Sequence, residues 1–179
     1  MNRFGAAIIA AAPLNPFTEG NAMPDMLVRL YDLPDYSEKY QKLESNGIKI
    51  IRPMTPNKRK VVEWARAHFN DDWADEISTA FTRFPVSCFI AYDEKQQKMV
   101  GFAGYDCTYR GFFGPTGVDE ELRGKGIGGA LFMRCMEAMR DEGYAYAVIG
   151  SIGPKEFYER MVGATIIEGS DPGIYKDLF

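Results

Sequence analysis

The sequence predicts a mixed α/β (α+β) fold, a mostly antiparallel sheet with helices on both faces, from three observations. Segments with helical periodicity dominate the first half of the chain, and near Val86 the hydrophobic period changes from 3.6 to 2. Two strand-like segments joined by a charged turn follow. A strand, a glycine-rich loop, a long helix, a further strand and a last helix come next. This order predicts a mixed sheet that is covered by helices.

The composition is that of an ordinary globular protein. The chain has 179 residues, 46% hydrophobic and 26% charged, which suits one domain with a sizeable core. Its formal net charge of −4 argues against a nucleic-acid partner, which favours a basic surface. The three cysteines have no metal-ligand spacing and form an odd number, so no metal site and no disulfide framework are predicted. This cysteine usage suits the cytoplasm.

The first 24 residues differ from the rest of the chain. They contain the apolar run "FGAAIIAAA" behind a single Arg3, followed by Pro13, Pro16 and Gly20. The run resembles the apolar part of a short signal segment, but only one positively charged side chain precedes it. No apolar stretch reaches the length of about 18 residues that spans a membrane. We therefore expect residues 1–24 to be a flexible N-terminal extension, residues 25–179 to form a single domain, and the protein to have no membrane partner.

The elements of the first half are short. Met26–Leu30 is a strand candidate that Pro34 closes, and apolar residues at helical spacing between Tyr36 and Leu43 predict a helix. Gly47 is a plausible helix end, and residues 48–52 alternate like a strand.

Two helices are expected next. Thr55 and Pro56 form a helix start, an N-cap hydroxyl followed by proline, and a second helix begins at Asp71 or Asp72 and ends at Pro85. Their predicted buried stripes are Val61, Ala65, His68 and Phe69 in the first helix, and Trp73, Ile77, Ala80, Phe81 and Phe84 in the second.

The second half predicts most of the sheet. Residues 86–92, 99–105 and 112–118 are expected strands, and a long helix runs from about Gly124 to Glu142. The nearly continuous apolar run 144–149 predicts a central, parallel strand buried on both faces. Pro154 opens a last helix, and one or two closing strands are expected, near residues 164–168 and 173–175.

The stretch "LRGKGIGGAL" at residues 122–131 can be compared with three phosphate-binding patterns. The nucleotide P-loop fails because Gly126, and no Ser or Thr, follows Lys125. The letters of the dinucleotide fingerprint match, but five residues separate the glycines from the end of the strand at Val118. The next strand also ends at Gly150 and Ser151, without the acidic residue that holds a ribose.

The third pattern, R-x-x-G-x-G starting at Arg123, fits its surroundings. A strand and a short polar loop lead into a helix whose first turn is glycine-rich. Free N–H groups and the dipole at a helix start bind anions, and glycines let a pyrophosphate approach the backbone. Arg123 and Lys125 add local positive charge. The sequence therefore predicts that this loop holds a phosphate group.

The segment "VDEELRGKGIGGALFMRCMEAM" resembles the acetyl-CoA-binding segment of the GNAT superfamily of N-acetyltransferases, and "YAYAVIGSIGPKEFYERMVGA" resembles the strand and helix that follow it there. The resemblance implies the GNAT fold, in which two parallel strands, here 112–118 and 144–150, splay in a V that holds the pantetheine arm. Pro115 supports the splay from the sequence side, because proline cannot donate to a sheet ladder.

The resemblance also implies a reaction and its residues. The protein would transfer an acetyl group from acetyl-CoA, its cosubstrate, to a primary amine by direct attack, with Tyr158 as the acid that protonates the leaving thiolate. Ser151 stands where the family often has asparagine. Contacts with acetyl-CoA are implied for Thr116, Gly117, Val118, Arg123, Gly124, Lys125, Gly126, Ile127, Gly128, Ser151, Pro154 and Phe157.

Several points stay open at this stage. No general base is assigned: Asp106, Glu120 and Glu121 are candidates that fit solvated surface carboxylates better, and His68 fits a structural role. The acceptor is an unidentified small-molecule amine, and a homodimer is left open. The alternative function is that of a CoA-binding protein with a regulatory or partner-binding role and no turnover. An acidic group near two tryptophans favours a cationic acceptor, although aspartates also suit helix starts; it comprises Asp71, Asp72, Asp75 and Glu76.

Overall fold

The computed structural model describes residues 23–178. The expected N-terminal extension and its apolar run therefore lie almost wholly outside the described residues. Within them the strands form one sheet of seven, in the order β2-β3-β4-β5-β6-β1-β7. All neighbouring strands are antiparallel except β5 and β6. The strands are β1 Met26–Arg29, β2 Ile48–Ile51, β3 Cys88–Asp93, β4 Lys98–Tyr105, β5 Phe112–Val118, β6 Tyr146–Ile149 and β7 Thr165–Ile166.

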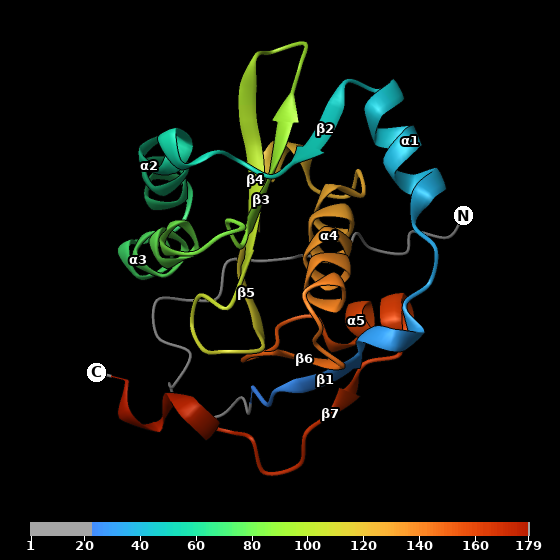
Figure 1. Ribbon diagram of the computed structural model, residues 1–179, viewed down its shortest axis with the longest axis vertical. Helices are drawn as coiled ribbons and strands as arrows, with labels where there is room; N and C mark the ends of the chain where they lie inside the picture. Colours follow the sequence, from blue (N-terminus) through green and yellow to red (C-terminus); the bar gives the residue numbers. More distant parts are fainter. Residues whose placement is uncertain (1–22, 179) are drawn as a thin grey trace.

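Helices cover both faces of the sheet (Figure 1), as the sequence predicted. One face carries α2 and α3, and the other carries α1, α4 and α5. The helices are α1 Ser37–Ser45, α2 Lys58–His68, α3 Asp71–Thr79, α4 Ile127–Asp141 and α5 Lys155–Val162.

The alternation of β3 shows how the sheet separates two cores. Phe89 and Ala91 point into the cluster built around α4, whereas Cys88 and Ile90 point into the cluster built on α2 and α3. Side chains of a strand alternate between faces, so a strand covered on both sides is apolar at nearly every position. The helix α4 is likewise buried over most of its length, which makes it the centre of the larger core.

The structure corrects the predicted start of α4. The helix begins at Ile127 and not at Gly124. Gly124 and Gly126 have φ angles of +78° and +86°, a left-handed conformation that glycine adopts freely and that no α-helix contains. The glycines thus form a turn before the helix and are not its first residues.

Three further expectations were wrong. Residues Gly173–Asp177 form a short 3-10 helix, called the C-terminal 3-10 helix below, and not a strand. Phe84 is 86% exposed, because α3 ends at Thr79 and its last turn continues only as a 3-10 turn to Thr82. His68, which was expected on the buried stripe of its helix, is exposed and stacks on Trp64, with 4.0 Å between ring centroids.

The strand β6 is central and parallel to β5, as expected, but it is not buried on both faces. Tyr146 is 48% exposed, and its ring contacts Tyr31, itself exposed, edge to face at 5.7 Å between centroids. An aromatic ring with a polar tip suits such a half-covered position.

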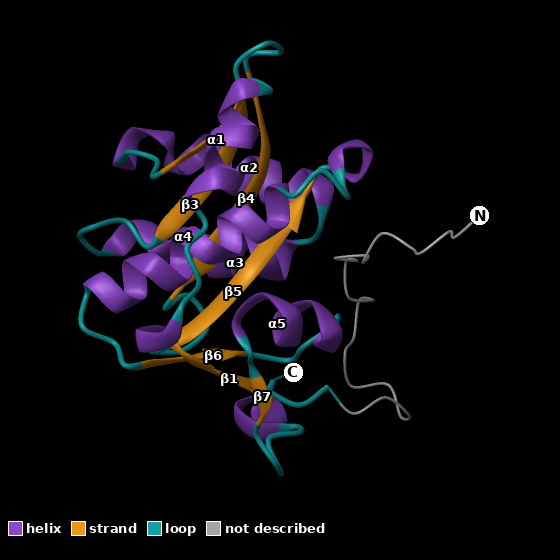
Figure 2. Cartoon of the chain, turned by 90° about the vertical axis from the view of Figure 1, so that its right-hand side faces the viewer, coloured by secondary structure: helices purple, strands orange, loops and turns teal. Residues whose placement is uncertain are grey.

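The parallel pairing of β5 and β6 is short. It consists of Phe112 opposite Val148 and Phe113 opposite Ile149. Beyond Phe113 the strand β5 stays paired with β4 up to Val118, while β6 ends at Ile149. In Figure 2 the two strands diverge from this point in a V, with α5 between their arms in this view. We call the point where the pairing stops the vertex and the space beyond it the opening.

The packing of Gly117 yields a stability prediction. A Cβ atom on Gly117 would lie 2.2 Å from Cζ of Phe69, and an aromatic ring inside a packed core cannot move away without cost. We expect Gly117→Ala to lower the free energy of unfolding by about 1–3 kcal/mol, measured by urea denaturation. Gly153→Ala is the control, because no atom lies within 4 Å of its Cβ position; equal stability of the two variants would contradict this packing.

Candidate functional site

The opening presents backbone groups of β5 that β4 does not use. Asp119 donates its N–H to the Val100 carbonyl on β4, at 2.9 Å. Because ladder hydrogen bonds alternate along an antiparallel strand, the N–H groups of Thr116 and Val118 point the other way, toward the opening. A ligand with an extended, amide-containing arm can pair with such groups as an added strand would.

The loop at residues 123–128 lies at the N-terminus of α4. Gly124, Lys125 and Gly126 are exposed, and no atom lies within 4 Å of a Cβ built on Gly126. The first N–H groups of a helix have no partner within the helix and attract anions through the helix dipole. The structure therefore gives this loop open space and free donors at one end of the V.

Arg123 carries an unsatisfied donor at this loop. Its Nε atom is buried and has no hydrogen-bond partner among residues 23–178, and its guanidinium lies 3.6 Å from the exposed Glu120 carboxylate. A buried donor without a partner costs about 1–3 kcal/mol. A bound phosphate would satisfy this donor, so the residues present fit the pyrophosphate that the sequence predicted.

Tyr158 lies on the α4 side of the sheet. The ring is buried against Phe132 of α4, 5.2 Å between centroids, and Phe132 in turn packs at 4.9 Å on Phe113, the last residue of β5 that pairs with β6. The hydroxyl makes no hydrogen bond within the described residues. Burial raises the pKa of Tyr158, so the hydroxyl stays protonated. The structure thus brings Tyr158, and Phe157 beside it, toward the vertex.

Ser151 follows β6 in a left-handed conformation, with a φ angle of +46°. Its N–H donates to the carboxylate of Asp25 at 2.9 Å. Asp25 is 5% exposed, and burial raises its pKa against the lowering effect of the Ser151 N–H. The carboxylate therefore fixes the backbone of Ser151 at the edge of the opening, while Pro154 caps α5 a few residues later.

The C-terminal 3-10 helix reaches the same region from the opposite face, where α3 lies (Figure 1). A Cβ on Gly150 would lie 2.3 Å from the Tyr175 hydroxyl oxygen and 3.0 Å from Cδ1 of Phe112. Burial, together with the charges of Glu76 and Asp25, raises the pKa of Tyr175. Tyr175 thus covers the vertex on the side away from Tyr158.

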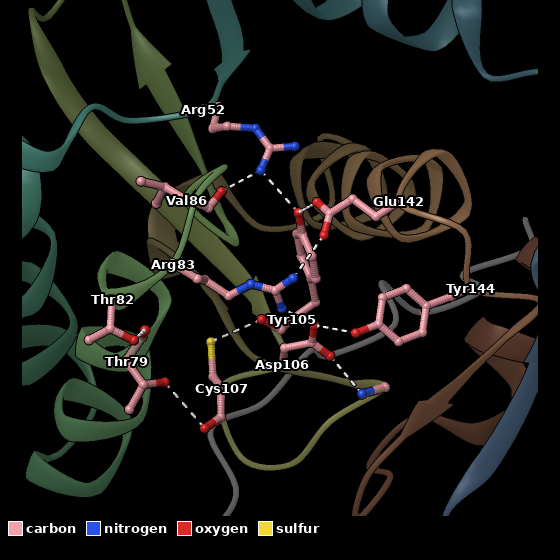
Figure 3. A network of polar contacts seen from close by, with 11 residues as sticks. Arg52, Thr79, Thr82, Arg83, Val86, Tyr105, Asp106, Cys107, Glu142 and Tyr144 are labelled. Atoms are coloured by element: carbon pink, nitrogen blue, oxygen red, sulfur yellow. Dashed lines mark hydrogen bonds and ion pairs between the residues drawn. The ribbon is translucent and has the colours of Figure 1, made fainter.

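Asp106, a candidate base at the sequence level, belongs to a structural network (Figure 3). Its carboxylate pairs with Arg83 and accepts hydrogen bonds from Tyr144 Oη at 2.7 Å and from the Gly111 N–H at 2.6 Å. The side chain is 5% exposed. The expectation of a solvated surface carboxylate was wrong, because the loop between β4 and β5 closes around Asp106.

The same network ties this loop to the end of α4. Arg83 also pairs with Glu142 at 2.9 Å, and Tyr105 donates a hydrogen bond to Glu142 and accepts one from Arg52 at 3.0 Å (Figure 3). Since its partners occupy the Asp106 carboxylate, a role in proton transfer is not supported by the geometry.

The other candidate groups lie elsewhere. Glu120 and Glu121 are exposed in the turn before Arg123. Burial raises the pKa of Cys88 and of Cys135, and raises that of Cys107 to about 12, so none is a ready thiolate. Among residues 23–178 there is no group of three or more side chains suited to a metal ion. No helix in this range is long and apolar enough to cross a membrane.

The geometry can be compared with known proteins. The family model described as "Acetyltransferase (GNAT) family" matches residues 58–164, more than half of the chain. The chain belongs to this family. The membership confirms the resemblance found in the sequence and supports acyl or acetyl transfer in general. No curated protein matches the chain significantly in sequence.

Several solved structures are similar to it, among them the following two. One is a GCN5-related glucosamine N-acetyltransferase region in a fungal multi-domain β-N-acetylglucosaminidase, at a TM-score of 0.68 and 12% identity, covering 83% of this chain and 20% of that one. The other is a GCN5-related N-acetyltransferase from Sphaerobacter thermophilus, at a TM-score of 0.59 and 18% identity, covering 82% of this chain and 50% of that one. The chain thus spans half or less of these neighbours, and at such identities the likeness establishes the fold alone.

The sequence did not single out two groups near the vertex, Tyr175 and Glu76, although the resemblance implied that the helices from Pro56 to Phe84 and the loop around residues 170–175 shape the acceptor pocket. Glu76 was included only in the acidic group of α3, where Asp71, Asp72 and Asp75 are exposed. A signal was present: Glu76 lies three residues after Trp73 and one before Ile77, on the buried side of the helix. For Tyr175 no local pattern was available, because its neighbours come from distant segments.

The network predicts a structural role for Asp106. We expect Asp106→Asn to lower the free energy of unfolding by about 1–3 kcal/mol, because the charged partner of Arg83 and two hydrogen bonds are weakened. Glu94→Gln is the control, since it removes an exposed ion pair with Lys49 worth at most about 1 kcal/mol. Chemical denaturation measures both. An unchanged stability with loss of enzymatic turnover would assign Asp106 to catalysis instead.

Proposed function

We propose that the protein transfers the acetyl group of acetyl-CoA to a primary amine of a small acceptor molecule by direct attack. The observation that carries the proposal is the opening between β5 and β6, whose pairing stops after two residue pairs, together with the loop after β5 in which Arg123 has an unsatisfied donor. The N–H groups of Thr116 and Val118 line the opening, and the loop from Arg123 to Gly128 supplies the anion site.

The binding roles follow from these positions. Arg123, Lys125 and the N–H groups at the start of α4 would hold the pyrophosphate, and β5 would pair with the pantetheine arm. Ser151, held by Asp25, and the helix start at Pro154 would border the arm on the β6 side. Acetyl-CoA supplies the activated acyl carbon when bound, and the chain's residues orient it.

Tyr158 is the proposed acid. Attack by the amine breaks the C–S bond and leaves charge on sulfur, which is stabilised by a proton donor. The Tyr158 hydroxyl has no hydrogen-bond partner among the described residues and is kept protonated by burial, which raises its pKa. It is therefore free to donate at the moment when charge develops on the sulfur.

Two measurements test the proposal. Calorimetric titration should show saturable binding of acetyl-CoA and no binding of NAD. Release of free CoA should follow when the protein is incubated with acetyl-CoA and a panel of primary amines: lysine, spermidine and glucosamine, the last chosen because the fungal structural neighbour is described as a glucosamine N-acetyltransferase region. Binding without release for any amine would favour a CoA-binding protein without turnover.

Tyr158→Phe should lower kcat by about 10²–10⁴-fold while leaving the affinity for acetyl-CoA unchanged, because general acid catalysis contributes a factor of this size. Steady-state release of CoA and calorimetry measure the two quantities. Tyr92→Phe is the control, since its hydroxyl bonds Gln97 at an exposed turn. Full turnover by Tyr158→Phe would show that the acid is another group.

Arg123→Ala gives the complementary result in the same assays. Removal of a charged donor to the pyrophosphate should weaken acetyl-CoA binding by about tenfold or more with little change in kcat. This split between binding and turnover separates the roles of Arg123 and Tyr158.

A further inference from the structure

The helix α3 lies directly over the vertex. A Cβ on Gly104 of β4 would lie 2.7 Å from Cδ1 of Ile77 and 3.4 Å from the carbonyl oxygen of Gly114. Gly114 follows Phe113, the last residue of β5 that pairs with β6. The buried side of α3 therefore faces the point where β5 and β6 part, and Glu76 immediately precedes Ile77.

Glu76 is a half-buried carboxylate without a cationic partner. No Lys, Arg or His nitrogen lies within 4.0 Å of it among residues 23–178. One oxygen, Oε1, accepts a hydrogen bond from Thr108 at 2.7 Å. Burial raises the pKa of Glu76 against the lowering effect of this hydrogen bond. Withdrawing a carboxylate from water without a counter-charge costs stability, which calls for a compensating use.

Tyr175 lies beside the end of β6 and is close enough to Glu76 to feel its charge. Its hydroxyl lies against Gly150, the residue after Ile149, and its pKa responds to the charge of Glu76. Glu76 and Tyr158 are thus on opposite faces of the sheet, with the vertex between them. Direct attack needs a base on one side of the acyl carbon and an acid at the sulfur on the other.

We propose that Glu76 is the general base that deprotonates the acceptor amine, directly or through one water molecule. This inference rests on the proposed acetyl transfer and deepens it. An N–H bond of the acceptor's ammonium group breaks and an O–H bond forms on Glu76. The freed lone pair then forms the C–N bond, the C–S bond breaks, and the sulfur takes the proton of Tyr158. The nitrogen, now positively charged, loses its second proton, which restores the Tyr158 hydroxyl, and Glu76 releases its proton to water, so that an amide and free CoA are formed.

The other carboxylates are less suited to this role. Arg83, Tyr144 and Gly111 occupy Asp106. The Asp25 carboxylate binds the Ser151 N–H and holds the backbone after β6. Glu76 keeps its second oxygen, Oε2, free of any described hydrogen bond.

The pH dependence follows from the groups around Glu76. Burial raises the pKa of Glu76, and the charge of Asp72 on α3 raises it further. Cys107 in the β4–β5 loop and Tyr175 in the C-terminal 3-10 helix are neutral near pH 7, because their own pKa values are raised. The base acts when ionised, so kcat/KM rises with pH through the raised pKa of Glu76. An alkylammonium has a pKa of about 10.4, so at neutral pH it needs a base to remove its proton before it can attack.

The test compares Glu76→Gln with Asp75→Asn, a neighbouring carboxylate of α3 that is exposed and paired with Arg66. The probes are acetyl-CoA and whichever of glucosamine, lysine and spermidine the wild-type protein acetylates fastest. Glu76→Gln should lower kcat/KM by about 10²–10⁴-fold and move its rise with pH to the pKa of the acceptor amine, about 10.4 for an alkylammonium, with unchanged acetyl-CoA affinity and an undiminished Tm. Asp75→Asn should match the wild type.

A second variant keeps the proposal falsifiable if Glu76→Gln does not fold. Glu76→Asp retains a carboxylate, so it should keep the rise with pH at a reduced rate. Two results would overturn the assignment of the base while leaving acetyl transfer intact. One is that Glu76→Gln keeps the wild-type rate and pH profile, and the other is that Asp25→Asn alone loses the pH profile. A wild-type protein that acetylates none of the amines would overturn the proposed function and the inference with it.

Discussion

The early end of the pairing between β5 and β6 is the constraint on which the rest of the structure depends. Two residue pairs join these strands, Phe112 with Val148 and Phe113 with Ile149. The next residues of β5 are Gly114, with a φ angle of +129°, and Pro115, which has no N–H to give to a neighbour. The regular geometry of β5 is interrupted at these residues and β6 ends at Ile149, so the N–H groups of Thr116 and Val118 beyond them have no partner strand among the described residues.

The two faces of the sheet supply different groups to this opening. On one face α4 begins beside the proposed anion site at Arg123, and α5 brings the buried ring of Tyr158, which packs on Phe132 of α4. On the other face α3 and the C-terminal 3-10 helix bring Glu76 and Tyr175. Segments that are distant in sequence therefore meet at one vertex, and the proposed acid and base approach it from opposite sides.

Much of the fold and one half of the candidate site could be predicted from the sequence. The loop at Arg123 and the motif around Tyr158 are contiguous patterns, and the order of helices and strands follows from their periodicity. The glycine turn before Ile127 was misread as helix because its left-handed φ angles are a backbone property that composition only hints at.

The other half depended on tertiary contacts. Glu76 stands among acidic residues that all suit the start of a helix, and its helical spacing from Trp73 is a weak signal beside them, whereas packing shows directly that it turns inward. Asp106 appeared as a surface carboxylate because its partners Arg83 and Tyr144 come from distant segments. Residues that act through such long-range contacts leave no local pattern to detect.

The central claim is that the opening beside β5 holds the extended arm of acetyl-CoA. Amide hydrogen exchange followed by NMR, with and without acetyl-CoA, tests it most directly. The account predicts that acetyl-CoA slows exchange at Thr116 and Val118 and in the turn from Gly124 to Ile127, because their N–H groups gain partners. Unchanged exchange at Thr116 and Val118 under saturating acetyl-CoA would contradict it.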